Sequence, residues 1–148
     1  MTSLYSDLKD RVAVVTGGSR GIGAATARAL ADQGLRVVVS GRAERALADV
    51  VADIESRGGQ ALGVRADVTR FDEIEALRER AEAAFGPADA LIAFAGASLG
   101  RRGPVHTLSE SDWRACIDAN LTATFFSLKS FLPGMLERGR GAIVTMAS

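Results

Sequence analysis

The sequence predicts an α/β fold in which helices cover both faces of a parallel sheet. Short β-branched runs alternate with longer segments whose apolar residues recur at helical spacing, and this alternation is typical of βαβ units. The valines at 37–39 form an unbroken run of the kind found in parallel strands buried on both faces. A glycine-rich joint at 16–23 separates the first run from the first helical segment. With 148 residues, the chain is predicted to form a single domain, 1–148, with a sizeable core.

Composition narrows the classes of function. The 18 basic and 18 acidic residues cancel, so no charge excess favours binding to nucleic acid or to an anionic membrane. No apolar run approaches the roughly eighteen residues of a membrane span, and residues 1–9 lack the apolar segment of a signal peptide. Cys116 is the only cysteine, which excludes an internal disulfide and a cysteine-cluster metal site; no metal site is predicted. These features favour a soluble cytoplasmic protein.

The predicted elements follow one another in regular order. Strands are predicted at about 11–16, 36–40, 61–66, 90–96 and 141–146, and helices at about 21–33, 43–57 and 111–138. A further helix carries Phe71, Ile74, Leu77, Ala81 and Phe85 on one face and ends before Gly86. The segment 97–107 between the fourth strand and the last helix is predicted to be a loop.

Local signals predict where the helices begin and end. Gly34 is placed to end the first helix in a left-handed conformation. Thr69 with Asp72, and later Ser109 with Asp112, resemble capping boxes at helix starts. Pro133 predicts a kink or an early stop in the last helix.

The glycine-rich joint predicts an anion-binding site. It reads Thr16-Gly17-Gly18-Ser19-Arg20-Gly21-Ile22-Gly23. Glycines let a bulky ligand approach the peptide groups closely. The first turn of the following helix presents N–H groups without intrahelical partners at the positive end of the helix dipole, so a pyrophosphate suits this position. The alternative is a tight glycine turn that holds no ligand.

The spacing Thr16-Gly17-x-x-x-Gly21-x-Gly23 resembles the signature of the short-chain dehydrogenase/reductase family. The resemblance implies a doubly wound (Rossmann) parallel sheet of about five strands in the order 3-2-1-4-5. It also implies binding of NAD(H) or NADP(H) and hydride transfer between the nicotinamide and a small-molecule carbonyl or alcohol. The residues of the joint that it assigns to the cofactor are Gly17, Ser19, Arg20, Gly21, Ile22 and Gly23.

The residues after the second strand favour NADP over NAD. A carboxylate near this point accepts from the ribose 2′-OH of NAD, whereas an arginine accommodates a 2′-phosphate. The chain reads Ser40-Gly41-Arg42, with no carboxylate. By resemblance, Arg42 and Arg20 occupy the two positions where basic residues accompany NADP. The alternative is that both arginines are ordinary solvated charges.

Two further segments match cofactor contacts of the family. Asp67-Val68 resembles its pair beside the adenine ring, although Asp67 could equally form a local turn. Ala95-Gly96 ends the fourth strand and is implied to pass close to the cofactor ribose. The family usually has two asparagines before this pair, where this chain has Ala93 and Phe94, so side-chain hydrogen bonds are predicted to be missing there.

Two residues match the family's catalytic positions. Asn120 lies mid-helix in a segment resembling the one that carries the catalytic Asn; the alternative is a plain buried amide. Ser148 falls on the position of the catalytic Ser, where a hydroxyl can bond to a substrate carbonyl as charge develops on its oxygen. His106 is the only histidine, but a lone histidine in a polar loop is more often solvated, and it is assigned no catalytic role.

The family's Tyr-x-x-x-Lys pair lies beyond Ser148 and has no counterpart in this sequence. The chain is therefore predicted to be truncated relative to the full family fold. The favoured function is an NADPH-preferring oxidoreductase that lacks full activity, and the alternative is a non-catalytic dinucleotide-binding module or partner subunit. The broad apolar face of the long helix around Asn120 predicts a homo-oligomer, because the equivalent helix pairs across the oligomer in relatives.

Overall fold

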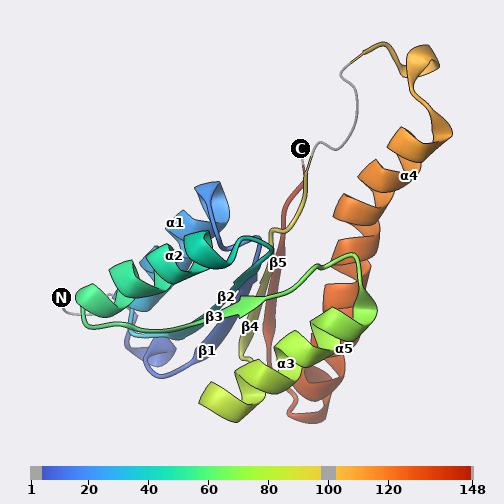
Figure 1. Ribbon diagram of the computed structural model, residues 1–148. Helices are drawn as coiled ribbons and strands as arrows, with labels where there is room; N and C mark the ends of the chain where they lie inside the picture. The colour runs from blue at the N-terminus through green and yellow to red at the C-terminus, as the bar shows by residue number, and fades with distance from the viewer. Residues whose placement is uncertain (1–4, 98–102, 148) are drawn as a thin grey trace.

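The computed structural model describes residues 5–97 and 103–147, which contain a five-stranded parallel sheet. The strands lie in the order β3-β2-β1-β4-β5 (Figure 1). Their bounds are Val12–Thr16 (β1), Arg36–Gly41 (β2), Gln60–Arg65 (β3), Ala90–Ala93 (β4) and Ala142–Thr145 (β5). The predicted strand order is confirmed.

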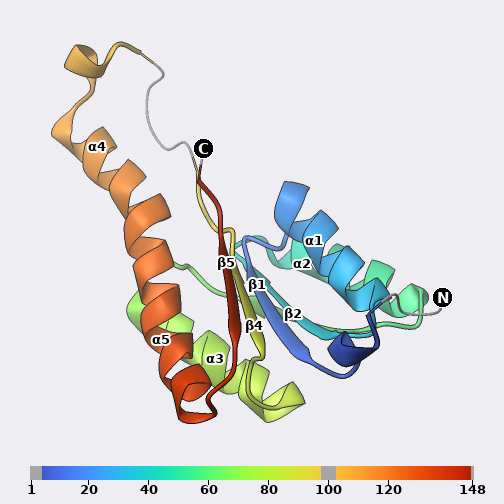
Figure 2. The same cartoon turned by 180° about the vertical axis from the view of Figure 1, so that it is seen from behind.

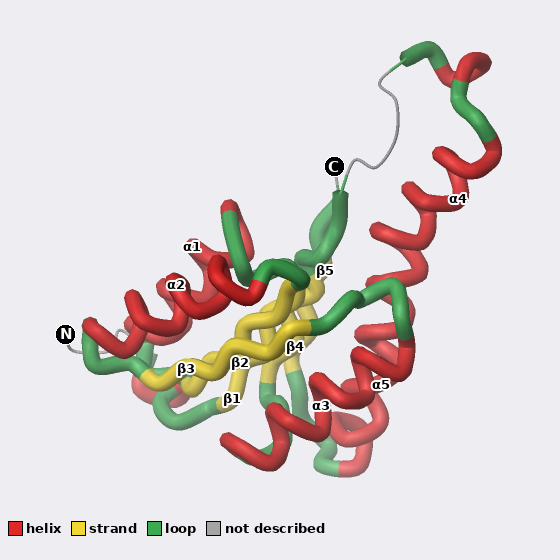
Figure 3. Tube along the Cα trace, in the orientation of Figure 1, coloured by secondary structure: helices red, strands yellow, loops and turns green. Residues whose placement is uncertain are grey.

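Helices cover both faces of this sheet, as predicted (Figures 1 and 3). One layer holds α1 (Gly21–Asp32) and α2 (Glu44–Ser56), and the other holds α3 (Phe71–Phe85) and α5 (Ala123–Glu137). Another helix, α4 (Glu110–Ile117), continues into α5 and extends past the end of the sheet (Figure 2). Short 3-10 turns lie at Ser6–Leu8 (η1) and Val105–Thr107 (η2). None of the described helices combines the length and apolar character needed to cross a bilayer.

The core consists of one apolar layer on each side of the sheet. All five residues of β1 are buried, because β1 lies in the middle of the sheet under both helix layers. On the side of α1 and α2 the layer includes Ala13, Val15, Ala24, Ala27, Val37, Val39, Leu47, Val50 and Ile54. On the side of α3 and α5 it includes Val14, Val38, Ile74, Leu77, Ala81, Leu91, Phe131 and Met135. Neighbouring strand residues thus point to opposite faces, as the pleat requires.

The helix-end predictions were right at two positions and wrong at a third. Gly34 has φ +88° at the end of α1, and Ser109 with Asp112 forms a capping box at the start of α4. Thr69 does not cap α3. Its N–H and hydroxyl both donate to Asp67, and the N-cap position falls on Arg70 without a side-chain cap. The Thr69 side chain therefore belongs to the turn before α3 and does not cap the helix.

The long helix is irregular at a different place from the one predicted. Five residues, Asp118–Thr122 (η3), form a π-helical turn between α4 and α5. The predicted kink or early stop at Pro133 was wrong as to the stop, since α5 continues through Pro133 to Glu137. Phe131 and Met135, on either side of the proline, are buried in the core, and this packing holds the last turn in place.

A partly buried hydrogen bond joins α5 to α3. The hydroxyl of Ser130, itself buried, donates to Glu75 Oε1 at 2.5 Å. This bond, followed by the pairing with Arg78, holds the pKa of Glu75 below its usual value. The two helices also share one apolar layer on this side of the sheet.

Candidate functional site

A cavity of about 340 Å³ lies where the carboxyl ends of the strands meet the start of α1. It is lined by all eleven residues that the family resemblance assigned to a cofactor: Gly17, Ser19, Arg20, Gly21, Ile22, Gly23, Arg42, Asp67, Val68, Ala95 and Gly96. These residues come from four separate stretches of sequence. The fold brings them together because parallel strands end at the same edge of a sheet, where such folds bind ligands.

Two glycines of the joint are required by close packing of the backbone. Gly17 has φ +70°, and a Cβ added there would lie 2.9 Å from the Ala95 nitrogen and from the Phe94 carbonyl oxygen. A Cβ on Gly23 would collide with the carbonyl oxygen of Gly17. The turn after β1 is therefore held between the end of β4 and the first turn of α1, and only glycine fits at either contact.

The first turn of α1 faces the cavity with its N–H groups available. The N-cap residue, Arg20, is extended and makes no side-chain capping bond. Gly21, Ile22 and Gly23, the first three residues of the helix, all line the cavity. N–H groups in this turn have no intrahelical acceptor and lie at the positive end of the helix dipole, which makes this wall of the cavity suited to an anion.

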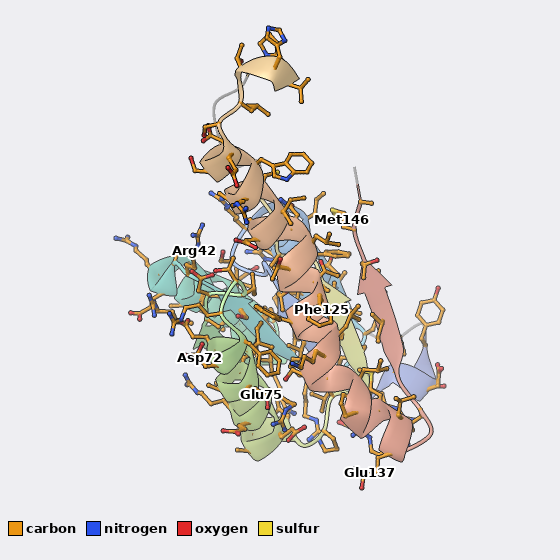
Figure 4. The ribbon with its side chains drawn as sticks, turned by 90° about the vertical axis from the view of Figure 1, so that its right-hand side faces the viewer. Arg42, Asp72, Glu75, Phe125, Glu137 and Met146 are labelled. Carbon is orange, nitrogen blue, oxygen red and sulfur yellow. The ribbon has the colours of Figure 1, made fainter. Side chains whose placement is uncertain are left out.

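The wall nearest β2 and β3 carries two arginines and one carboxylate. Arg20 and Arg42 are exposed, and both line the cavity; Figure 4 shows Arg42 beside the start of α2. Asp67 Oδ1 accepts hydrogen bonds from the N–H and the hydroxyl of Thr69, at 3.0 and 2.7 Å. These bonds hold the pKa of Asp67 below its usual value, and the charges of Arg42 and Arg70 act in the same direction. Asp67 thus forms a local turn and also lines the cavity, so its two predicted roles are compatible.

Asn120 lies in the π turn, where it is exposed and close to Gly96. Its Nδ2 donates to the carbonyl oxygens of Ala97, at 2.9 Å, and Cys116, at 2.8 Å. These two acceptors orient the amide, so its Oδ1 lies towards Gly96, where a Cβ would be only 2.6 Å away. The alternative of a plain buried amide was wrong. Asn120 does not line the cavity itself, but its neighbour Ala119 does.

The end of β4 differs from the family pattern in a way that the structure makes visible. Ala93 pairs with Thr16 on β1, and Thr16 pairs with Ser40 on β2. The Thr16 hydroxyl accepts from the N–H of Ala95 at 3.3 Å, whereas Ser40 Oγ is buried without a hydrogen-bond partner in the described part of the chain. Phe94 instead packs against the core and lines the cavity.

Sequence reasoning assigned no ligand contact to several residues of the lining: Gly41, Ala66, Thr69, Phe94, Ala97, Ala119 and Met146. Most directly follow or precede a predicted contact, so strand-end position could have identified them. Met146 comes just after β5 (Figure 4), where parallel pairing with β4 brings it to the same edge.

Two of the residues considered at the sequence level lie elsewhere. Ser148 lies outside the described residues. His106 lies exposed in η2 and does not line the cavity. Within 5–97 and 103–147, no three His, Cys, Asp or Glu side chains gather closely enough to hold a metal ion.

The fold and the glycine turn define a dinucleotide-binding type of α/β protein. A family model described as short chain dehydrogenase matches residues 11–148, and the chain therefore belongs to the short chain dehydrogenase family. The resemblance found in its sequence is confirmed. Members of this family bind NAD(H) or NADP(H).

Individual proteins of the family are similar over nearly the whole chain. Cis-4-hydroxycyclohexanecarboxylate dehydrogenase of Sinomonas cyclohexanicum is 45% identical over 139 residues, 94% of this chain. The crystal structure of a metagenomic short-chain oxidoreductase in complex with NADP has a TM-score of 0.90 and 40% identity over 97% of this chain. A variant of actinorhodin polyketide ketoreductase with NADPH has a TM-score of 0.89 and 39% identity over the full chain.

These relatives are longer than this chain. The matched part makes up 55% of the Sinomonas dehydrogenase, 64% of the metagenomic oxidoreductase and 55% of the ketoreductase. The chain thus spans somewhat more than half the length of the proteins it matches.

Proposed function

We propose that this chain binds NADP(H) in the cavity at the carboxyl ends of the strands, as the dinucleotide-binding part of a short-chain oxidoreductase. The observation that carries the proposal is the convergence of the eleven cofactor-assigned residues on one cavity. The diphosphate is assigned to the first turn of α1, where uncapped N–H groups suit an anion. The solved complexes of two similar proteins with NADP and NADPH support the same cofactor.

The preference for NADP(H) over NAD(H) rests on charge. Arg20 and Arg42 line the same cavity, and the end of β2 carries no carboxylate that would accept from a ribose 2′-OH. A guanidinium pairs with a phosphate through two parallel hydrogen bonds, and the pair is stronger than one between neutral groups. Among the described residues that line the cavity, only Asp67 is acidic, and Thr69 already bonds to one of its carboxylate oxygens.

The reaction assigned to the whole protein is hydride transfer between the nicotinamide and a small-molecule carbonyl or alcohol. On this proposal Ser148 polarises the carbonyl oxygen, and Asn120 holds a water that relays the proton. The orientation of Asn120 supports this role, because Nδ2 donates to two backbone carbonyls and Oδ1 is left as the acceptor of the amide. A dinucleotide-binding module without turnover would use the same cavity. NADPH oxidation over a panel of carbonyl compounds, compared with that of Ser148→Ala, distinguishes the two.

Charge reversal at Arg42 tests the cofactor assignment. We expect Arg42→Asp to raise the Kd for NADPH by about 100-fold, since a charge-assisted phosphate contact is replaced by repulsion. The Kd for NADH should change by less than about threefold, because NADH has no 2′-phosphate. Isothermal titration calorimetry measures both values.

Arg45→Asp is the matched control for this measurement. Arg45 is also exposed and lies three residues further along, but it does not line the cavity. Its substitution should leave both affinities nearly unchanged. If Arg42→Asp loses affinity for NADPH and NADH equally, Arg42 does not bind the 2′-phosphate.

We also propose that the chain self-associates through the long helix. The side chains Trp113, Leu121 and Phe125 are 57%, 65% and 55% exposed, although they are large and apolar. Together with Ile117 they repeat every four residues, which places them along one face of the helix. An apolar stripe of this kind marks an interaction surface rather than a solvated one.

A further inference from the structure

The strand β5 forms an open edge of the sheet. In the described part of the chain it pairs with β4 alone. All four of its residues are exposed, and the apolar side chains of Val144 and of Met146, just beyond the strand, are 48% and 46% exposed. Figure 4 shows this strand, which leads to Met146, at the margin of the molecule beside the long helix. An edge of this kind presents unpaired N–H and C=O groups to a further strand.

The hydrogen bonds to β4 decide which backbone groups of β5 face outwards. The N–H of Ala142 donates to the carbonyl oxygen of Asp89, just before β4, at 2.9 Å. Alternate residues of a paired strand direct their N–H and C=O groups to the same neighbour, so Val144 also faces β4. The N–H and C=O groups of Ile143 and Thr145 therefore point away from the sheet.

The sequence around β5 carries none of the features that normally prevent edge pairing. Residues 141–147 contain no charged side chain and no proline, the two residue types that most often block an edge. Ile143, Val144 and Thr145 are β-branched and favour an extended backbone. An uncharged segment with high β-propensity is well suited to pair with a copy of itself. The absence of charge in this segment also favours a second copy over a charged partner.

We propose that two copies of this chain pair antiparallel through β5, with the two-fold axis at Val144. In this register Ile143 exchanges both of its backbone hydrogen bonds with Thr145 of the second copy, and Thr145 does the same with Ile143. Val144 lies opposite Val144 of the second copy, in an apolar cross-strand pair. This contact is separate from the apolar stripe of the long helix, and it does not depend on dinucleotide binding.

Symmetry favours the antiparallel arrangement. A two-fold contact uses the same surface on both copies, so the same residues must supply donors and acceptors on each side. Antiparallel strands meet this condition, because directly opposite residues exchange both bonds, whereas parallel strands pair through staggered residues. The outward groups of Ile143 and Thr145 are then all paired.

Amide hydrogen exchange of the ¹⁵N-labelled wild-type chain, followed by NMR, tests this pairing residue by residue. A contact through one short strand is small and weak, so exchange is compared at about 20 µM and about 1 mM protein. We expect the amides of Ile143 and Thr145 to exchange about tenfold more slowly at the higher concentration. The amide of Val144 faces β4 and should exchange at the same rate at both concentrations.

Thr145→Pro removes the outward N–H that the pairing needs. Proline is tolerated on an edge strand where the N–H faces away from the sheet, so the pairing with β4 should remain. Each copy loses one donor, which should weaken the contact by about 30-fold and abolish the protection of the Ile143 amide. Thr145→Ala is the matched control, since it changes the side chain but keeps the N–H, and it should keep the protection.

A second variant covers the case in which Thr145→Pro does not fold. Val144→Lys places two like charges opposite each other at the two-fold axis and should also abolish the protection of Ile143. Val144→Thr is its control, because threonine is similar in shape and uncharged, and it should keep the protection.

The outcomes decide what covers the edge. Protection that rises with concentration, persists in Thr145→Ala and disappears in Thr145→Pro or Val144→Lys supports the pairing. Fast exchange of Ile143 and Thr145 at both concentrations would show an uncovered edge and overturn the proposal. Slow exchange at both would show that the chain covers its own edge, which overturns it equally. Loss of protection in Thr145→Ala as well as in Thr145→Pro would exclude pairing through the backbone.

Discussion

Replacing Gly23 with alanine lowers the free energy of unfolding by about 3 kcal/mol or more, since the new methyl group meets main-chain atoms rather than a movable side chain. The added Cβ would collide with the Gly17 carbonyl oxygen and lie 2.8 Å from the Gly17 carbonyl carbon. The Gly17 backbone cannot move away from the new methyl group, because it is packed against the backbone of Ala95 and Phe94. The N–H of Gly18, bonded to the Ser40 carbonyl oxygen at 2.9 Å, anchors the same turn. NADPH binding should be lost with the geometry of the turn.

Urea unfolding and calorimetry with NADPH measure the two effects of Gly23→Ala. Gly58→Ala is the control: Gly58 has φ +82° at the end of α2, away from the cavity, and a Cβ there meets nothing within 4 Å. It should lose about 1 kcal/mol of stability from its backbone conformation alone, and keep its affinity for NADPH. A Gly23→Ala variant that matched the wild type in both measurements would refute the close packing of the turn.

Introducing a charge on the apolar stripe of the long helix weakens self-association by about 100-fold or more, the scale of a buried aromatic anchor at an interface. Phe125→Asp is the variant of choice, because Phe125 lies in the first turn of α5 and is about half exposed (Figure 4). In an interface the new carboxylate would be buried without a partner. Sedimentation equilibrium over a range of concentrations measures the dissociation constant.

Ala115→Asp supplies the control for that experiment. Ala115 is exposed on α4, two residues from Trp113, and therefore lies on the opposite side of the helix. The Ala115→Asp variant adds the same charge outside the apolar stripe, and it should leave the dissociation constant of self-association unchanged. A wild-type chain that stays monomeric at high concentration, or equal weakening by both variants, would exclude the stripe as the interface.

The strand order and the cofactor residues could be predicted because the glycine spacing at Gly17, Gly21 and Gly23 resembles a family signature, and the resemblance implies both. The valines at 37–39 are typical of a buried parallel strand and favour the same fold. Once the strands are parallel, their carboxyl ends share an edge. The positions of Arg42, Asp67 and Ala95 at that edge follow without further information.

The features that could not be predicted depend on competition between partners of similar strength. Thr69 resembled a helix cap, but α3 begins later, with Arg70 at the N-cap position, and Thr69 bonds to Asp67 in the preceding turn. Glu73 belongs to α3 by its helical position, yet it bonds to a residue outside the helix. Asn120 was expected inside a regular helix, whereas it lies in a π turn and donates to the carbonyl of Ala97, which is distant in sequence. Such choices are made only when the tertiary structure forms.

The central claim is that the N–H groups opening α1 bind the diphosphate of a dinucleotide. Titration of the ¹⁵N-labelled chain with NADPH, followed by heteronuclear NMR, tests it most directly. The amides of Gly21, Ile22 and Gly23 should shift furthest, while those of Gly58 and Gly86, outside the cavity lining, should stay in place. A folded chain that binds NADPH without moving the first three amides, or that shows no binding at all, would contradict the claim.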